Sequence, residues 1–171
     1  EEVEDHRGMA LSLTNLGLLA ELRGDLAEAD ARHSQSQSHR EMCKGGLSMS
    51  VSFINQGITA MHQQNYVEAE LRFRQSYSSS EKSQDTIGMG SALNLLGRLY
   101  AQTEKKLPLD ACIESLEKLE DFQDTPLLLS WHSHLCLLSY LRSGSVEKEG
   151  LELLCVASLI ACDTPQSEPD M

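Results

Sequence analysis

A repeat with a period of 40 residues constrains the fold of this chain more than any other feature of its sequence. Two sets of residues keep the spacing in one register: Gly17, Gly57 and Gly97, and Met9, Met49 and Met89. A weaker fourth copy places Leu137 where the earlier copies have glycine. Repeats of this length are supersecondary units that bury their apolar faces by stacking on one another. We therefore expect one array of four units, near residues 9–45, 46–85, 86–124 and 125–163.

Each copy has the pattern of two helices joined by a short turn. In the first copy Leu13, Leu16 and Ala20 are spaced three and four residues apart, which predicts a helix with one apolar face. Gly17 lies inside this helix, where glycine costs about 1 kcal/mol relative to alanine. We therefore expect a neighbouring helix to approach closely at Gly17 and at the equivalent glycines.

Polar residues predict where further helices begin. Asp25 and Asn65 are 40 residues apart, and their side chains can accept hydrogen bonds from the free amides of a first helical turn. Thr125, followed by proline, is the expected cap of a helix in the last copy. The third copy departs from the pattern, because its small residue falls at Ala111, two positions later than Ala69 requires. We expect a two-residue insertion there.

The composition favours an all-α fold and excludes several classes of function. Of the 171 residues 40% are apolar but only 5% aromatic, so the core must be built from aliphatic residues that suit helices. The net charge of −12 makes direct contact with nucleic acid unfavourable. No apolar run approaches the roughly 20 residues of a membrane span. The five cysteines lack the spacing of a zinc site or disulfide framework, which predicts reduced thiols in a reducing compartment.

Candidate catalytic and metal-binding groups are few. His132, His134 and Cys136 are the most suggestive cluster, but residues two apart on a helix point in different directions and cannot converge on one ion. Cys155 and Cys162 share a helical face and are expected to be small packing residues. The sequence has no phosphate-binding loop, nucleophile elbow or HExxH motif. We therefore expect no enzymatic activity, metal, cofactor or small-molecule substrate.

The first helices of stacked helix pairs would line a long concave wall suited to an extended peptide. The residues of this wall that we expect to bind a partner are Asn15, Leu18, Asn55, Ile58, Asn94, Arg98, Trp131, His134 and Leu138. The same stripes contain, as further or alternative positions, Leu11, Leu22, Val51, His62, Ser91, Leu95, Gln102, Leu135 and Arg142.

Each of these residue types has a second interpretation. The amides of Asn15, Asn55 and Asn94 can hold a peptide backbone, because an amide has both a donor and acceptors, but they fit a bond to the neighbouring helix equally well. The aliphatic residues fit packing between repeats, and Trp131 fits the core of the last repeat. Arg98 can pair with an acidic ligand residue or lie at the solvated surface.

The repeated motif resembles the tetratricopeptide repeat (TPR). The matching residues of the first copy are Asn15-Leu-Gly17, Ala20, Gly24-Asp25 and Ala29, and the resemblance extends to about Cys162. It implies a right-handed superhelical solenoid of antiparallel helix pairs, with longer helices than the common TPR.

A closer resemblance is to the carboxy-terminal repeats of the TPR subunit of the cohesin loader, the Mau family. It is carried by Gly57, Asn65-Tyr-Val-Glu-Ala69, Leu95-Leu-Gly97 and Leu129-Ser-Trp131. This resemblance implies a non-catalytic scaffold that wraps the extended amino-terminal segment of the large HEAT-repeat loader subunit. It also implies a nuclear protein that supports cohesin loading and sister-chromatid cohesion. The chain would then be the carboxy-terminal part of a longer array. Residues 164–171 contain two prolines and no apolar period, so we expect a disordered tail there.

Two other classes of protein fit the repeats. One is a cytosolic adaptor of the spindle-orientation or kinesin-light-chain type, although the predicted wall lacks the basic pockets expected of a motor light chain. The other is a sensor domain of a larger regulatory protein, such as a transcription activator or an ATPase. A chaperone cofactor fits less well, because only Arg98 and Arg142 would be available to hold a terminal carboxylate.

Overall fold

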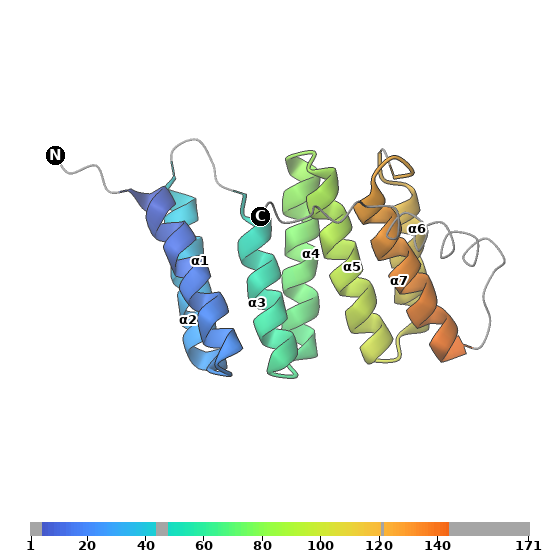
Figure 1. The fold of residues 1–171 in the computed structure, drawn as a ribbon, viewed down its shortest axis with the longest axis horizontal. Helices are drawn as coiled ribbons and strands as arrows, with labels where there is room; N and C mark the ends of the chain where they lie inside the picture. The colour runs from blue at the N-terminus through green and yellow to red at the C-terminus, as the bar shows by residue number, and fades with distance from the viewer. Residues whose placement is uncertain (1–4, 44–47, 121, 144–171) are drawn as a thin grey trace, which may run out of the picture.

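The computed structural model describes residues 5–43, 48–120 and 122–143, and in these ranges the chain is all-α, as its composition predicts. The second half of the expected fourth copy and the expected tail at 164–171 lie outside the described residues. Figure 1 shows the helices standing side by side in a row, each antiparallel to the next. The helices are α1 (His6–Leu22), α2 (Leu26–Met42), α3 (Ser50–His62), α4 (Tyr66–Lys82), α5 (Thr86–Gln102), α6 (Lys106–Glu117) and α7 (Pro126–Ser143).

The helix boundaries recur at the spacing of the sequence repeat. The second helices α2, α4 and α6 begin at Leu26, Tyr66 and Lys106, each 40 residues after the last. The turns before them also match, because Gly24, Gln64 and Glu104 all have positive φ angles, of 77°, 59° and 61°. Residues 40 apart are called equivalent below, and α1, α3, α5 and α7 are called the first helices.

The caps predicted at Asp25 and Asn65 are present, but the third copy does not contain the expected insertion. Asp25 and Asn65 are N-caps whose side chains accept hydrogen bonds from the amides of Glu28 and Glu68, as predicted. The prediction for Ala111 is wrong, since Ala111 is exposed and α6 begins in register. Leu109 takes the position equivalent to Ala69 and is buried there, so a larger residue fills the slot.

The mid-helix glycines lie at close helix contacts, as expected. A Cβ atom at Gly17 would overlap the ring of His33 on α2, and one at Gly57 would overlap the ring of Phe73 on α4. At Gly97 the overlap would be with the side chain of Leu135 on α7. Glycine therefore lets another helix approach at each site, which offsets its poor helix propensity.

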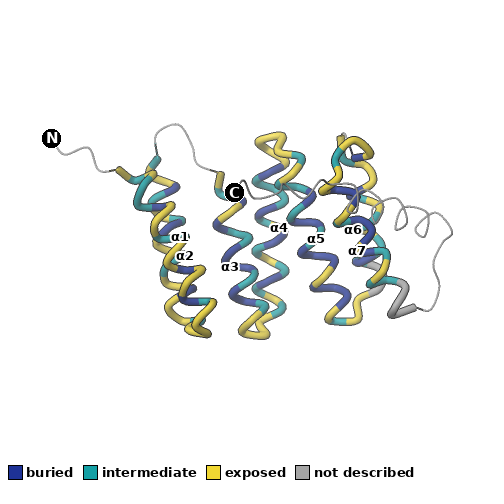
Figure 2. Tube along the Cα trace, viewed as in Figure 1, coloured by how far each residue is buried: buried dark blue, intermediate teal, exposed yellow. Residues whose placement is uncertain are grey.

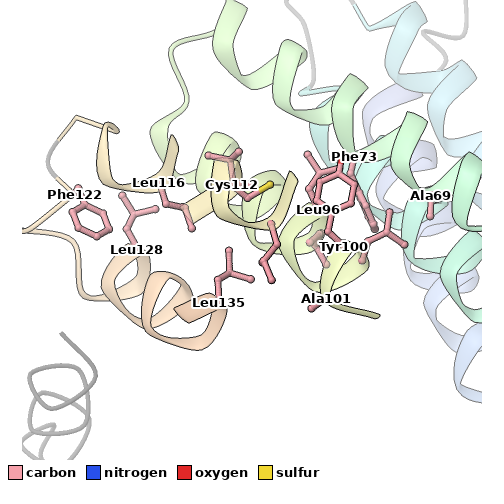
Figure 3. Packing of buried hydrophobic residues seen from close by; sticks show 14 of the residues in the cluster. Ala69, Phe73, Leu96, Tyr100, Ala101, Cys112, Leu116, Phe122, Leu128 and Leu135 are labelled. Carbon is pink, nitrogen blue, oxygen red and sulfur yellow. The ribbon is translucent and has the colours of Figure 1, made fainter. Parts of the chain in front are cut away.

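The apolar core runs from α3 to α7 and leaves the first helix pair outside it. Its members come mainly from α4 to α7, and several of them, including Phe73, Leu96, Leu116, Leu128 and Leu135, are shown in Figure 3. Figure 2 shows that buried residues are more frequent on α3 and α5 than on α1 and α2. The buried apolar side chains of α1 and α2 are only the small ones of Ala10, Ala20 and Ala29. These two helices therefore join the rest of the chain by other means.

Polar contacts join the first helix pair to α3, and we call this interface the polar seam. Gln56 of α3 donates to Gln37 of α2 at 2.9 Å, and Thr59 donates to Glu21 of α1. Four buried polar atoms of α2 and α3 have no hydrogen-bond partner among the described residues: His33 Nε2, Arg40 Nε, Ser52 Oγ and Gln56 Oε1. Because an unpaired buried polar group costs about 1–3 kcal/mol, the polar seam is held less strongly than the apolar core.

His33 makes the stability of the first helix pair depend on pH. Burial lowers the pKa of His33 below its ordinary value, and the nearby carboxylates of Glu21 and Asp30 oppose the shift only in part. The unfolded chain therefore binds a proton at His33 more tightly than the folded chain does. As the pH falls below about 6.5, protonation of His33 lowers the free energy of unfolding.

Replacing His33 with phenylalanine, the residue at the equivalent Phe73, is expected to weaken this pH dependence. The phenyl ring would lie over Gly17 as Phe73 lies over Gly57. It has no titratable group, so the folded chain would no longer bury a side chain that takes up a proton on unfolding. Urea unfolding at pH 8 and pH 5 measures the effect: the stability advantage of His33→Phe should be larger at pH 5. An advantage of equal size at both pH values would show that His33 does not titrate on unfolding.

Candidate functional site

All the residues predicted to bind a partner lie on the first helices, but they differ in exposure. Asn15, Leu18, Arg98 and His134 are exposed. Ile58, Asn94, Trp131 and Leu138 are partly buried, and Asn55 is buried. The side chain of Arg142 lies outside what the structure describes. The exposed residues therefore form the part of the predicted wall that is open to a ligand.

An exposed aliphatic stripe runs along α1. Leu11, Leu18 and Leu22 are spaced seven and four residues apart, so they share one face of the helix, and Leu22 is 84% exposed. Asn15 lies on the same face, between Leu11 and Leu18. Val51 of α3, the equivalent of Leu11, is exposed as well. Single exposed leucines are ordinary, but several on one face mark an interaction surface.

The predicted asparagine amides are not engaged by neighbouring helices. None of the hydrogen bonds between described residues uses the side-chain amide of Asn15, Asn55 or Asn94. The Oδ1 atom of Asn94 is buried without a partner, and Asn55 is only 8% exposed. Most buried polar groups in proteins are hydrogen-bonded. Amides that make no such bond keep donors and acceptors that a ligand can use. The alternative that they tie one helix to the next gains no support.

The three amides are nevertheless not equally available. Asn15 is exposed, whereas Asn55, its equivalent, is buried. Leu95 and Leu135 occupy the same position on α5 and α7 and are buried too. The side chain at this position of a first helix is therefore buried in α3, α5 and α7, each of which follows another helix pair. The sequence pattern alone does not show this burial.

Several apolar candidates contribute to packing. Ile58, Trp131 and Leu138 are partly buried and pack against the apolar core. Trp131 lies close to Gly90 of α5, where a Cβ atom would be 3.0 Å from its ring. Leu135, which we considered as an alternative to His134 on the wall, is completely buried, so that alternative is wrong.

The charged candidate on α5 remains open to a ligand. Arg98 is exposed, and no ion pair to it is seen within the described ranges. By contrast, Arg74 of α4 is committed to Glu70, which it contacts at 3.0 Å and which also accepts from the Tyr100 hydroxyl. Arg98 is therefore available to an acidic residue of a partner.

The histidines and cysteine of α7 do not form a site. His132 is buried, with Nε2 2.7 Å from Oε1 of Glu117, while His134 points to solvent, so the predicted divergence is confirmed. The Sγ atom of Cys136 is 3.6 Å from Nε2 of His132. However, burial and the charge of Glu117 raise the pKa of Cys136 to about 11, which keeps the thiol protonated and poorly nucleophilic at neutral pH.

Within the described ranges no group of three or more His, Cys, Asp or Glu side chains could hold a metal ion. Cys43, Cys112 and Cys136 are free thiols, while Cys155 and Cys162 lie outside the described residues. None of the helices in this part of the chain is long and apolar enough to cross a bilayer.

Comparison with known proteins gives no family for this chain. No protein-family model matches it, and no curated protein matches it either. The class that the structure defines is an all-α protein, and the resemblance to TPR and cohesin-loader repeats rests on the residues that carry it in the sequence.

Two features of the surface were not predicted from the sequence. Leu16 was expected in the apolar stripe that faces a neighbouring helix, but it is exposed on α1, as is Leu19. The polar seam was also missed. Comparing equivalent positions shows that this face changes from the leucines Leu16 and Leu19 to the polar residues Gln56 and Thr59, but it does not show which of the two faces is covered.

Proposed function

We propose that this chain is a non-catalytic protein-interaction scaffold, a TPR-like superhelical solenoid of helix pairs whose first helices hold an extended segment of another protein. The observation that carries the proposal is the exposed stripe of Leu11, Leu18 and Leu22 on α1, with the free amide of Asn15 on the same face. The helix boundaries that recur every 40 residues support the solenoid.

The exposed residues suit a peptide that binds in an extended conformation. The amide of Asn15 can donate to a backbone carbonyl and accept from a backbone N–H, which gives affinity without a sequence requirement. The leucines would bury apolar side chains of the peptide, at about 25 cal/mol for each Å² of apolar surface removed from water. Arg98 of α5 would pair with an acidic residue. The ligand is therefore a segment with apolar residues followed or preceded by an acidic one.

The first partner to test is the extended amino-terminal segment of the large cohesin-loader subunit. This choice follows from the resemblance to the Mau family, and a nuclear role in cohesin loading belongs to the same proposal.

Substitutions on the exposed stripe are expected to weaken binding of this segment without affecting folding. Asn15→Ala with Leu18→Ser removes one hydrogen bond of about 1 kcal/mol and one apolar contact of about 1.5 kcal/mol, so Kd should rise about 60-fold. Isothermal titration calorimetry with the purified chain and the partner segment measures the change. The matched control is Leu71→Ser with Gln75→Ala on α4, four residues apart on a second helix, which should leave Kd unchanged.

The outcomes separate the scaffold from its partner. Equal losses of affinity in the two double variants would contradict binding on the first helices. If the loader segment does not bind but another protein binds in a way that Asn15→Ala with Leu18→Ser weakens, the loader assignment is wrong and the scaffold stands.

A further inference from the structure

The N-terminus of α3 lacks the cap that the equivalent helices have. α1 and α5 begin directly after Asp5 and Asp85, two equivalent residues whose side chains accept hydrogen bonds from amides of the first turn. α3 begins at Ser50, four residues later than this register requires, and its N-cap, Met49, makes no side-chain cap bond. Of the hydrogen bonds between described residues, none is donated by the backbone amides of residues 50–52. The positive end of this helix therefore presents backbone donors that nothing in the described ranges uses.

A buried cation lies beside this N-terminus. Arg40, near the end of α2, is 5% exposed, and its Nη1 donates to the carbonyl oxygen of Ser48, two residues before α3, at 3.2 Å. Its Nη2 donates to Thr14 of α1, while Nε has no hydrogen-bond partner among the described residues. None of the described carboxylates forms an ion pair with Arg40, and the adjacent Glu41 accepts from Gln37 instead. Because a buried charge without a counter-charge is unfavourable, this guanidinium favours an added anion.

A hydroxyl on the first turn of α3 also lacks a partner. Ser52 is buried, and its Oγ makes no hydrogen bond to any described residue. Gln56, one turn further along α3, donates to Gln37 of α2 at 2.9 Å. Since α2 and α3 are antiparallel (Figure 1), Ser52 lies about one turn nearer the end of α2, at the level of Arg40. The unpartnered hydroxyl, the guanidinium and the unused amides therefore share one junction between α2 and α3.

The first turn of α3 has one side that is open to solvent. Ser50 faces α4, where its hydroxyl is 2.8 Å from that of Ser76, and Ser52 faces α2. Between them Val51 is 42% exposed, and Ser48, just before the helix, is exposed as well. An ion can therefore approach the amides of this turn from the side of Val51.

We propose that the junction of α2 and α3 is a binding site for a phosphate group, held by the backbone amides of residues 50–52, the Ser52 hydroxyl and the Arg40 guanidinium. Amides at a helix N-terminus and a nearby arginine are the donors that bind phosphate in proteins. A phosphate has more acceptor oxygens than a carboxylate and can therefore bond to several of these donors at once. It would act at α3 as the carboxylates of Asp5 and Asp85 act at α1 and α5. The proposal does not depend on the ligand of the first helices.

The test follows the backbone amides by ¹H–¹⁵N NMR while sodium phosphate is added at constant pH and ionic strength. The resonances of residues 50–52 should shift and saturate, whereas those of Gly8 and Gly88, which already donate to aspartate caps, should stay in place. A second titration with O-phosphoserine identifies the source of the group: tighter binding than that of phosphate would assign the site to a phosphate ester, and weaker binding to the free ion. No saturable shift at residues 50–52 with either compound would overturn the proposal.

Two substitutions test the donors separately. Arg40→Gln removes the charge and should raise the Kd for phosphate about 10-fold or more, whereas the control Arg32→Gln, which removes a cation paired with Glu28 on the same helix, should leave Kd unchanged. Met49→Asp supplies a carboxylate cap that competes for the amides, so it should weaken phosphate binding by a similar factor. It decides the question even if Arg40→Gln does not fold. Unchanged phosphate binding in Met49→Asp, or equal losses in Arg40→Gln and Arg32→Gln, would overturn the proposal.

Discussion

Replacing Phe73 with alanine should lower the free energy of unfolding by about 3–5 kcal/mol, the largest effect expected from a single substitution in this chain. The phenyl ring is completely buried, lies over the Cα atom of Gly57, and belongs to the core cluster that links α4 to α5. Truncation would leave a cavity that the helix backbones on both sides cannot fill. Urea unfolding followed by circular dichroism measures the loss.

Leu71 provides the control on the same helix. It lies two residues before Phe73 and is about half exposed, so Leu71→Ala should change the free energy of unfolding by less than about 1 kcal/mol. If Phe73→Ala costs no more than Leu71→Ala, the contact between Gly57 and Phe73 does not hold α3 and α4 together.

Replacing Leu135 with alanine should cost about 2–5 kcal/mol. This side chain is completely buried on α7 and packs over Gly97 of α5, so its loss would weaken the packing of the last described helix on the core. The exposed neighbour His134 is the control, and His134→Ala should be nearly neutral for stability. Similar effects of the two substitutions would contradict the orientation of α7, in which Leu135 faces the core and His134 faces solvent.

Much of the helix pattern was predictable because it depends on local chemistry. The caps at Asp25 and Asn65 need only a short acceptor before a helix, and the contact at Gly57 needs only a residue small enough to admit a ring. Such signals are contained in a few adjacent residues. The third copy shows where such local signals fail. A small residue was expected at the helix contact, which pointed to Ala111, but the buried position is occupied by the larger Leu109.

The exposure of the candidate site was harder to predict, since it depends on which neighbours a helix has. Asn15 and Asn55 are equivalent in sequence, but within the described residues only Asn55 follows a helix pair, and only Asn55 is buried. Leu16 is exposed for the same reason. A stripe of residues identifies the faces of a helix, whereas the packing of the whole array decides which face remains open.

Binding on the first helices can be observed directly through the side-chain amide resonances of the chain. The NH₂ groups of Asn15 and Asn94 lie on α1 and α5, and those of Gln35 and Gln75, on α2 and α4, serve as references. In a titration with the partner segment followed by ¹H–¹⁵N NMR, the two asparagine resonances should shift and saturate with one Kd, while the two glutamine resonances stay in place. Shifts confined to Gln35 and Gln75 would contradict the proposed binding surface.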